Sequence, residues 1–126
     1  MSKEDKIKAC IATDFISHIT KTDWGFGVSI MHKNGIAFAR LYQYADDTET
    51  VVLCSLSVDE NVRKQGIGTK LQQMRENIGI VLGASRSCLW VKNKTWMRNW
   101  YERRGYTYLE DYKGEEDSIW MVKSLK

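Results

Sequence analysis

The stretch of residues 25–58 constrains the fold of this chain most, because it contains three strand-like runs in close succession. Residues 25–31 and 36–44 flank Lys33-Asn34-Gly35, and an Asn-Gly pair between such runs is typical of a tight hairpin turn. A second polar turn leads to residues 50–58, which are rich in the β-branched residues that favour strands. The three strands predict an antiparallel meander.

Apolar residues at helical spacing lie on both sides of this meander. Before it, the intervals of three and four predict one amphipathic helix over residues 7–21, with Ile7, Cys10, Ile11, Phe15 and Ile19 on its apolar face. After it, the patterns predict a helix over 66–82, a strand over 87–91, a helix over 94–104 and a closing hairpin of 106–112 with 118–123.

The order α, β-β-β, α, β, α, β-β is that of an α+β or mixed α/β protein, with a mainly antiparallel sheet flanked by helices. A chain of 126 residues has the length of one domain, so we expect a single domain over residues 1–126.

Composition narrows the functional classes. The net charge of +3 is too small to suggest a dedicated nucleic-acid binder, although it suits an anionic small ligand. Cys10, Cys54 and Cys88 contain no CxxC pair, which favours reduced thiols and a cytoplasmic location. With two histidines and no metal-ligand spacing we expect no metal, and without an apolar run of ~20 residues we expect no membrane segment.

The turn Arg63-Lys64-Gln65-Gly66-Ile67-Gly68 lies between a predicted strand and a predicted helix. The first N–H groups of a helix are unpaired and carry partial positive charge, while glycines let a phosphate approach the backbone. The turn lacks the third glycine of a dinucleotide fingerprint and the Gly-Lys of a P-loop. It therefore predicts a pyrophosphate site of another kind, and a solvated glycine-rich turn is the alternative.

This turn and a second motif, Trp100-Tyr101-Glu102-Arg103-Arg104-Gly105-Tyr106, stand in the order found in a known family. The first resembles the Arg/Gln-x-x-Gly-x-Gly/Ala loop of the GNAT N-acetyltransferases, and the second resembles their aromatic-Tyr-x-x-x-Gly-aromatic helix end. The similarity extends over residues 25–126. It departs at the front, where one predicted helix replaces the usual first strand and two helices.

The resemblance implies that acetyl-CoA is the co-substrate. Its pantetheine arm would bond the main chain of Leu56 and Val58 in an opening beside the third meander strand. The side chains of that strand alternate, so we expect Val52, Cys54, Leu56 and Val58 on one core-facing side. The residues implied to hold the pyrophosphate are Arg63, Lys64, Gln65, Gly66, Ile67, Gly68 and Thr69.

Two further residues are implied by similarity. The family often has an asparagine seven residues before the helix tyrosine, and Asn93 lies eight before Tyr101, so we assign Asn93 to the cofactor with a helix cap as the alternative. Tyr101, whose spacing to Gly105 matches the family, is the expected catalytic residue, donating a hydrogen bond to the departing thiolate. For Trp96 and Trp100 we expect packing in the core.

The implied activity is transfer of an acetyl group to a primary amine of a small molecule or peptide, by direct attack in a ternary complex. The sequence supplies no convincing base, and Cys54 and Cys88 lack a histidine partner in the motifs, which argues against a covalent intermediate. A catalytically silent CoA-binding or protein-interaction domain is the main alternative, and a homodimer stays open.

Two surface features bear on partners. Arg40, Tyr42 and Tyr44 share one strand face and would suit base stacking, but the modest net charge argues against a nucleic-acid module. An acidic stretch in the terminal hairpin would attract a cationic amine if it lined the acceptor entrance, with a solvated turn as the alternative; it comprises Glu110, Asp111, Glu115, Glu116 and Asp117.

Overall fold

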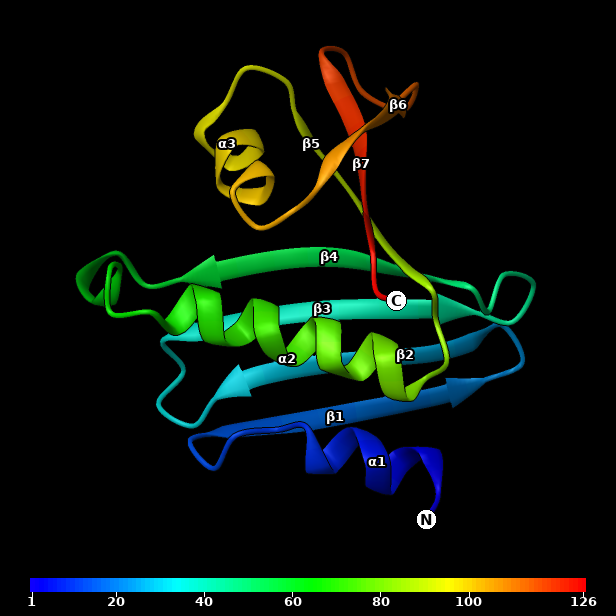
Figure 1. Cartoon of the computed structure of the whole chain (residues 1–126). Coiled ribbons are helices and arrows are strands. Elements are labelled where there is room, and N and C mark those ends of the chain that lie inside the picture. The colour runs from blue at the N-terminus through cyan, green and yellow to red at the C-terminus, as the bar shows by residue number, and fades with distance from the viewer.

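A computed structural model describes residues 1–126 as one seven-stranded sheet with helices packed against it (Figure 1). The strand order across the sheet is β1-β2-β3-β4-β5-β7-β6. The strands are β1 (Phe15–Thr22), β2 (Gly25–His32), β3 (Ala37–Tyr44), β4 (Thr50–Val58), β5 (Arg86–Lys92), β6 (Thr107–Asp111) and β7 (Ser118–Ser124). The helices are α1 (Lys3–Ala9), the 3₁₀ turn η1 (Glu60–Val62), α2 (Ile67–Val81) and α3 (Trp96–Glu102).

The predicted fold class is confirmed, and the elements from residue 25 onward match their predicted positions closely. The single helix over residues 7–21 is wrong. The helix α1 ends at Ala9, and residues 15–22 form β1, which pairs with β2 from Phe15 opposite His32 to Thr22 opposite Gly25. Phe15 and Ile19 are four residues apart, a spacing that fits one face of a strand as well as one face of a helix.

The front of the chain is therefore closer to the family pattern than its sequence suggests. The first strand is present as β1, whereas a tight turn at Asp23-Trp24 joins it directly to β2. No helix lies between these two strands, so the two helices usual in the family are absent from this part of the chain. None of the helices has the length and hydrophobicity of a membrane-spanning segment.

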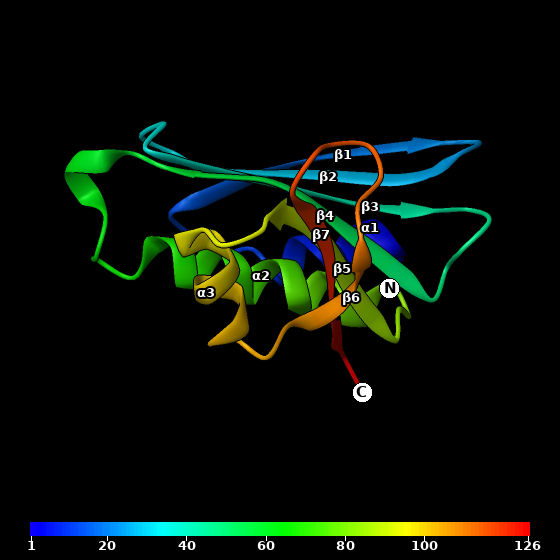
Figure 2. The ribbon, with the colours of Figure 1, turned by 90° about the horizontal axis from the view of Figure 1, so that it is seen from above.

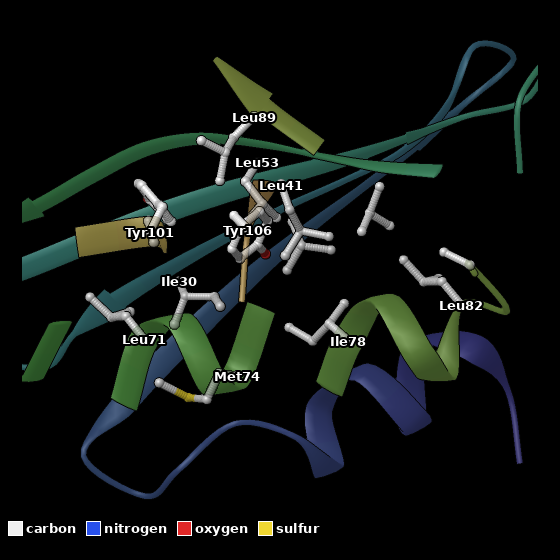
Figure 3. Close-up of a cluster of buried hydrophobic side chains, with 14 of the residues drawn as sticks. Ile30, Leu41, Leu53, Leu71, Met74, Ile78, Leu82, Leu89, Tyr101 and Tyr106 are labelled. Atoms are coloured by element: carbon white, nitrogen blue, oxygen red, sulfur yellow. The ribbon is translucent and has the colours of Figure 1, made fainter. Parts of the chain in front are cut away.

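The core lies between the sheet and α2, because α2 buries an apolar stripe at intervals of three and four residues. Figure 3 shows Leu71 and Ile78 of α2 directed at the sheet, whereas Met74 points to the segment between α1 and β1, where its sulphur lies 3.4 Å from the backbone nitrogen of Ala12. Ile7 of α1 is fully buried in the same cluster. In Figure 2, α2 and α3 lie on the same side of the sheet, and we call the opposite side the open face.

A β-bulge divides β4 into two parts. The register with β3 shifts between Ala39 and Arg40, and Ser55 has a φ of 53°. Before the bulge Val51 and Leu53 face the core, and after it Leu56 and Val58 pack against the core. The expectation that Val52, Cys54, Leu56 and Val58 share one face is thus wrong, because an inserted residue reverses the alternation.

β4 and β5 diverge soon after they meet. Their parallel pairing covers only Thr50–Val52 with Arg86–Cys88, and the rest of β4 has no strand partner on that side. Figure 1 shows β5 and β7 turning away from β4, with α3 beside them. We call the opening between residues 53–58 of β4 and residues 89–92 of β5 the fork.

Candidate active site

The loop between β4 and α2 adopts the backbone conformation expected of an anion site. Lys64 has a φ of 74° and Gly66 a φ of 80°, both left-handed, and Gly66 occupies the N-cap position of α2. No side chain caps this helix end. The N–H groups of Ile67, Gly68 and Thr69 therefore have no acceptor within the helix and carry its partial positive charge.

The two glycines of the loop serve different purposes. A Cβ atom on Gly66 would meet nothing within 4 Å, so glycine is favoured there by its left-handed backbone rather than by crowding. A Cβ atom on Gly68 would lie 3.7 Å from side-chain atoms of Val58 and Trp100, which is ordinary van der Waals contact. The outer side of Gly66 is thus open to a phosphate.

Polar side chains of the loop are already tied to their surroundings. Nε of Arg63 donates to the carbonyl oxygen of Val58 at 3.1 Å, so this main-chain acceptor already has a hydrogen-bond partner. The hydroxyl of Thr69 accepts from Nη2 of Arg104 at 2.8 Å. The Arg104 guanidinium also lies 3.4 Å from the centre of the Trp100 ring, so a cation not expected from the motif stands beside the first turn of α2.

The fork meets the loop at Val58. Leu56 and Val58 lie in the part of β4 that has no partner on the β5 side, so its main chain can accept an added extended segment. Both residues are half-buried and contact the core through their side chains. The arrangement fits the pantetheine arm of acetyl-CoA, which would bond the strand while its pyrophosphate lay at the loop.

Tyr101 of α3 lies at the inner end of the fork. Its side chain is 4% exposed, and its ring makes edge contacts with Trp100 and Tyr106 at centroid distances of 4.9 and 5.4 Å. Its hydroxyl accepts a hydrogen bond from Nη2 of Arg75 at 3.0 Å. The ring is therefore part of the core, while the hydroxyl is held by a cation that also reaches β4.

The two tryptophans of α3 differ. Trp100 is half-buried and packs against the core, as expected, whereas Trp96 is 67% exposed. The expectation that Trp96 packs in the core is wrong. α3 is a helix of 7 residues and Trp96 is its first residue, whereas the later Trp100 and Tyr101 are the ones that contact the core.

Asn93 lies in the connection between β5 and α3. Its side-chain oxygen accepts from the backbone N–H of Lys94 at 3.0 Å and from the guanidinium of Arg98. Asn93 also lines a hollow of about 590 Å³ together with the turn between β6 and β7, and no residue of the 63–69 loop lines that hollow. The structure thus brings Asn93 toward the terminal hairpin rather than to the glycine turn.

Comparison with known proteins decides the family. The model of the acetyltransferase (GNAT) domain matches residues 24–108, which include the meander, the glycine turn, the fork and Tyr101. The chain belongs to the GNAT family. A search among curated proteins gives no significant match.

Solved structures support the GNAT fold. Nourseothricin acetyltransferase is 18% identical with a TM-score of 0.65, over 90% of this chain and 86% of that chain. Aminoglycoside 6'-acetyltransferase type Ii is 22% identical with a TM-score of 0.65, over 79% and 70%. The PaiA N-acetyltransferase from Thermoplasma acidophilum in complex with coenzyme A is 18% identical with a TM-score of 0.64, over 78% and 59%. At these identities the likeness concerns the fold.

This GNAT chain also holds a buried polar network that its motifs do not indicate. Arg75 is 1% exposed and Gln72 is 3% exposed, both on α2. Gln72 donates to Glu76 and to the Tyr106 hydroxyl, each at 2.9 Å, and Glu76 pairs with Lys123 of β7 at 2.8 Å. A sequence signal existed, since Arg75 lies four residues after Leu71 and three before Ile78, inside the apolar stripe.

The cysteines of this GNAT chain show no sign of activation. Burial raises the pKa of the Cys54 thiol, although the nearby Arg75 and Arg40 pull it down, and burial likewise raises the pKa of Cys88. A nucleophilic cysteine needs the opposite shift. Of the two histidines, His32 faces Asp14 at 3.7 Å and His18 lies on β1.

Proposed function

We propose that this GNAT protein transfers the acetyl group of acetyl-CoA to a primary amine by direct attack in a ternary complex. One observation carries the proposal. A loop built for an anion, an unpaired stretch of strand and a buried tyrosine hydroxyl follow one another along the fork. These are the three contacts that a pyrophosphate, a pantetheine arm and a thioester sulphur require.

The donor would be held mainly by backbone groups. The N–H groups at the start of α2 and the cations Arg63 and Lys64 suit a pyrophosphate, because charge-assisted hydrogen bonds and the helix dipole act together. The main chain of Leu56 and the N–H of Val58 suit the amides of pantetheine. Asn93 would bind the cofactor away from the glycine turn, as a donor through its amide nitrogen, since its oxygen is engaged by Arg98.

The chemistry follows from these positions. The neutral amine attacks the thioester carbonyl carbon with its lone pair, its proton leaves to water, and the C–S bond then breaks with both electrons going to sulphur. Tyr101 donates a hydrogen bond to the sulphur as that charge develops. Transfer of the proton itself is uphill by about 1.5 pKa units, because a phenol (~10) is a weaker acid than a thiol (~8.5).

The acceptor would approach from the open face, where the fork is not covered by α2. Trp90 of β5 points to that face and stacks on Tyr112 with ring centres 4.7 Å apart. Tyr112 makes an edge contact with Trp120 at 5.3 Å. These rings and the acidic hairpin turn suit a small-molecule or peptide amine with a positive charge.

Other aspects of the proposal follow from composition. Three cysteines without a disulfide favour a cytoplasmic protein. We assign no metal to the reaction, since acyl transfer from a thioester to an amine needs none. Nucleic acid and membrane are not among the proposed partners. The hypothesis of nucleic-acid binding rests only on Arg40, Tyr42 and Tyr44, which do share the open face of β3.

Two measurements test the function. Calorimetry should give low-micromolar acetyl-CoA binding, and an assay of released CoA over a panel of primary amines should show turnover. Binding without turnover on any amine would favour the alternative, a silent CoA-binding or protein-interaction domain. Absence of binding would remove acetyl-CoA from the function altogether.

A further inference from the structure

Arg75 is a buried cation without a carboxylate partner. It is 1% exposed, and no Asp or Glu oxygen lies within ion-pair distance of it, since its neighbour Glu76 pairs with Lys123 instead. Burying a charge in this way is costly unless dipoles replace the water it loses. A chain that retains such a group holds a positive charge at one fixed place in its core.

The guanidinium of Arg75 links the β4 wall of the fork to Tyr101 of α3. Nη1 lies 3.3 Å from the carbonyl oxygen of Arg40 and 3.4 Å from those of Cys54 and Ser55. Two successive carbonyls of β4 point at one donor only because of the bulge at Ser55. Nη2 donates to the Tyr101 hydroxyl at 3.0 Å and to the side-chain oxygen of Gln72 at 2.6 Å.

The hydrogen bond also fixes how the Tyr101 hydroxyl is used. Arginine has only donors, so the phenol oxygen is the acceptor in this pair and its own hydrogen must point elsewhere. That hydrogen has no acceptor within the protein. A hydroxyl that accepts from a cation donates more strongly, because the two hydrogen bonds polarise one another.

We propose that Arg75 is the positioning residue of this enzyme: it holds the β4 bulge and the Tyr101 hydroxyl together and makes that hydroxyl a donor to thiolate. The inference rests on the proposed function, and it assigns to Arg75 the stabilisation of negative charge on the CoA sulphur. Its positive field already acts at β4, where it opposes the effect of burial on the pKa of Cys54.

The binding of CoA itself tests this without any acceptor. If the site stabilises the thiolate, the thiol pKa of bound CoA lies below that of free CoA, so affinity rises as pH increases from 7 to 9. We expect a gain of about tenfold for CoA over this range, which a fall of about one to two units in the thiol pKa on binding produces. Desulpho-CoA, which lacks the thiol, should show no such gain.

The comparison of the two ligands isolates the thiol. The titratable and charged groups that surround the hydroxyl titrate alike in both complexes, so the difference between CoA and desulpho-CoA excludes them. They are Arg75 and Glu76 on α2, Arg40 on β3, Cys54 on β4, Arg104 after α3, Tyr106 before β6 and Lys123 on β7.

Three variants give the outcome. Arg75→Met and Tyr101→Phe should each remove the pH-dependent gain, and the double variant should lose no more than either. Arg75→Lys keeps the charge and should retain part of the gain. Arg86→Met is the matched control, because Arg86 bonds Thr50 at 2.8 Å at the closed end of β4 and β5, away from the fork.

The outcomes separate the two proposals. A wild-type protein that binds neither ligand contradicts the proposed function. Binding of CoA with the same pH dependence as desulpho-CoA overturns the role of Arg75 while acetyl-CoA binding stands. If Arg75→Met does not fold, Arg75→Lys and Tyr101→Phe decide, and a full gain in both overturns the inference. Turnover should fall about 10²-fold in Arg75→Met with KM for acetyl-CoA little changed.

Discussion

The two halves of the sheet are built differently. β1 to β4 pair in antiparallel register along most of their lengths through short turns. β5, β7 and β6 form a second antiparallel group, and only three parallel residue pairs join the two groups. The fork is therefore a product of topology. A short parallel junction between two twisted antiparallel groups leaves strand backbone unpaired, and an extended ligand can use it.

The halves also differ in how they attach to α2. The first half is held by apolar contact, with Ile30 and Leu41 beneath Leu71 and Ile78. The second half is held by apolar residues of the same core and also by hydrogen bonds between buried side chains, such as Glu76 with Lys123. Apolar contact tolerates small shifts, whereas directional bonds fix positions, so the geometry of the fork is set by this network together with the bonds from Arg75 to β4 and Tyr101.

The largest expected effect comes from the loop where the two halves meet α2. Gly66→Val should abolish measurable acetyl-CoA binding, because a β-branched residue resists the φ of 80° and would displace the N–H groups at the start of α2. The measurement is calorimetry with acetyl-CoA, after circular dichroism shows that the variant is folded.

Gly35→Val is the matched control for this change. Gly35 has a φ of 73° in the β2–β3 turn, and a Cβ atom there also meets nothing within 4 Å. It should lose about as much stability, roughly 1–2 kcal/mol, with acetyl-CoA affinity retained. Equal affinity in both variants would mean that the loop is only a turn.

The next effect contrasts two tyrosines of the second half. Tyr101→Phe should lower kcat about 10²-fold with acetyl-CoA affinity within a few-fold, because the lost hydroxyl acts on charge that develops as the thiolate leaves. Tyr106→Phe should instead lower the free energy of unfolding by about 1–3 kcal/mol, since its buried hydroxyl bonds Ser87 at 2.8 Å and Gln72 at 2.9 Å.

Steady-state kinetics and thermal unfolding of both variants check this contrast. Burial raises the pKa of Tyr106, and the charge of Glu76 adds to the shift, so this phenol stays neutral and serves structure. If Tyr101→Phe keeps the kcat of the wild type, Tyr101 serves only to pack the core. The two tyrosines would then both have a structural role.

A smaller effect is expected for the cation of the loop. Arg63→Ala should weaken acetyl-CoA binding about tenfold, near 1.5 kcal/mol, the lower end for a charge-assisted contact at an exposed side chain. The loss should shrink at high salt. Arg103→Ala removes an exposed arginine beyond α3 and should leave affinity unchanged. Equal Kd values for the wild type and Arg63→Ala would remove this side chain from the site.

How far the sequence predicts the structure differs between the two halves. Residues 50–58 are predicted and observed as β4 with the same bounds, because β-branched residues between turn signals have one interpretation. The predicted helix over 7–21 includes most of β1, since Phe15 and Ile19 fit both periods. The pairing of β1 with β2 makes this segment a strand, and that contact is tertiary, so no local sequence pattern indicates it.

The candidate site shows the same division. The glycine turn and Tyr101 can be predicted from sequence motifs. Both motifs depend on residue type and on spacing along the chain, which the sequence shows directly. The bulge at Ser55 requires a serine with a left-handed backbone conformation, which no residue pattern indicates. Because of the bulge, Leu56 and Val58 lie on the core-facing side of the sheet instead of sharing a face with Val52 and Cys54. As a charged residue of a helix, Arg75 would be predicted to lie on the surface. Only its position within the apolar stripe of α2 indicates that it is buried.

The acidic turn of the terminal hairpin gives a few-fold effect. Glu115 pairs with Lys92 at 3.6 Å and Asp111 accepts from Tyr108, which leaves Glu116 and Asp117 as unpaired charges beside the hollow. Glu116→Gln with Asp117→Asn should lower kcat/KM for cationic amines about fivefold at low ionic strength and hardly at all in high salt.

Glu4→Gln with Asp5→Asn makes the same change of charge on α1, at the other end of the chain, and is the control for net charge. A neutral amine should be insensitive to both pairs. Equal salt dependence in the two double variants would remove the turn from acceptor recognition.

The smallest effect concerns the first half alone and tests how α2 is attached there. Asp14, just before β1, lies 3.3 Å from Nζ of Lys70 in the first turn of α2. Desolvation raises the pKa of Asp14, but hydrogen bonds from its own backbone and from Lys70 outweigh it, and the pKa lies below its ordinary value. A depressed carboxyl pKa contributes stability above the unfolded value of ~3.9, and this is lost as pH falls through the folded pKa.

Asp14→Asn should therefore lower Tm slightly at pH 6 to 7, and the difference from wild type should vanish in acid, below the folded pKa. Because both side chains are about half exposed, the difference should also shrink with salt. Asp23→Asn, in the turn between β1 and β2, is the control, since Asp23 makes no ion pair. A Tm difference that persists unchanged in acid would mean that Asp14 acts through its backbone turn, and that its ion pair with Lys70 does not help to hold α2 to the first half.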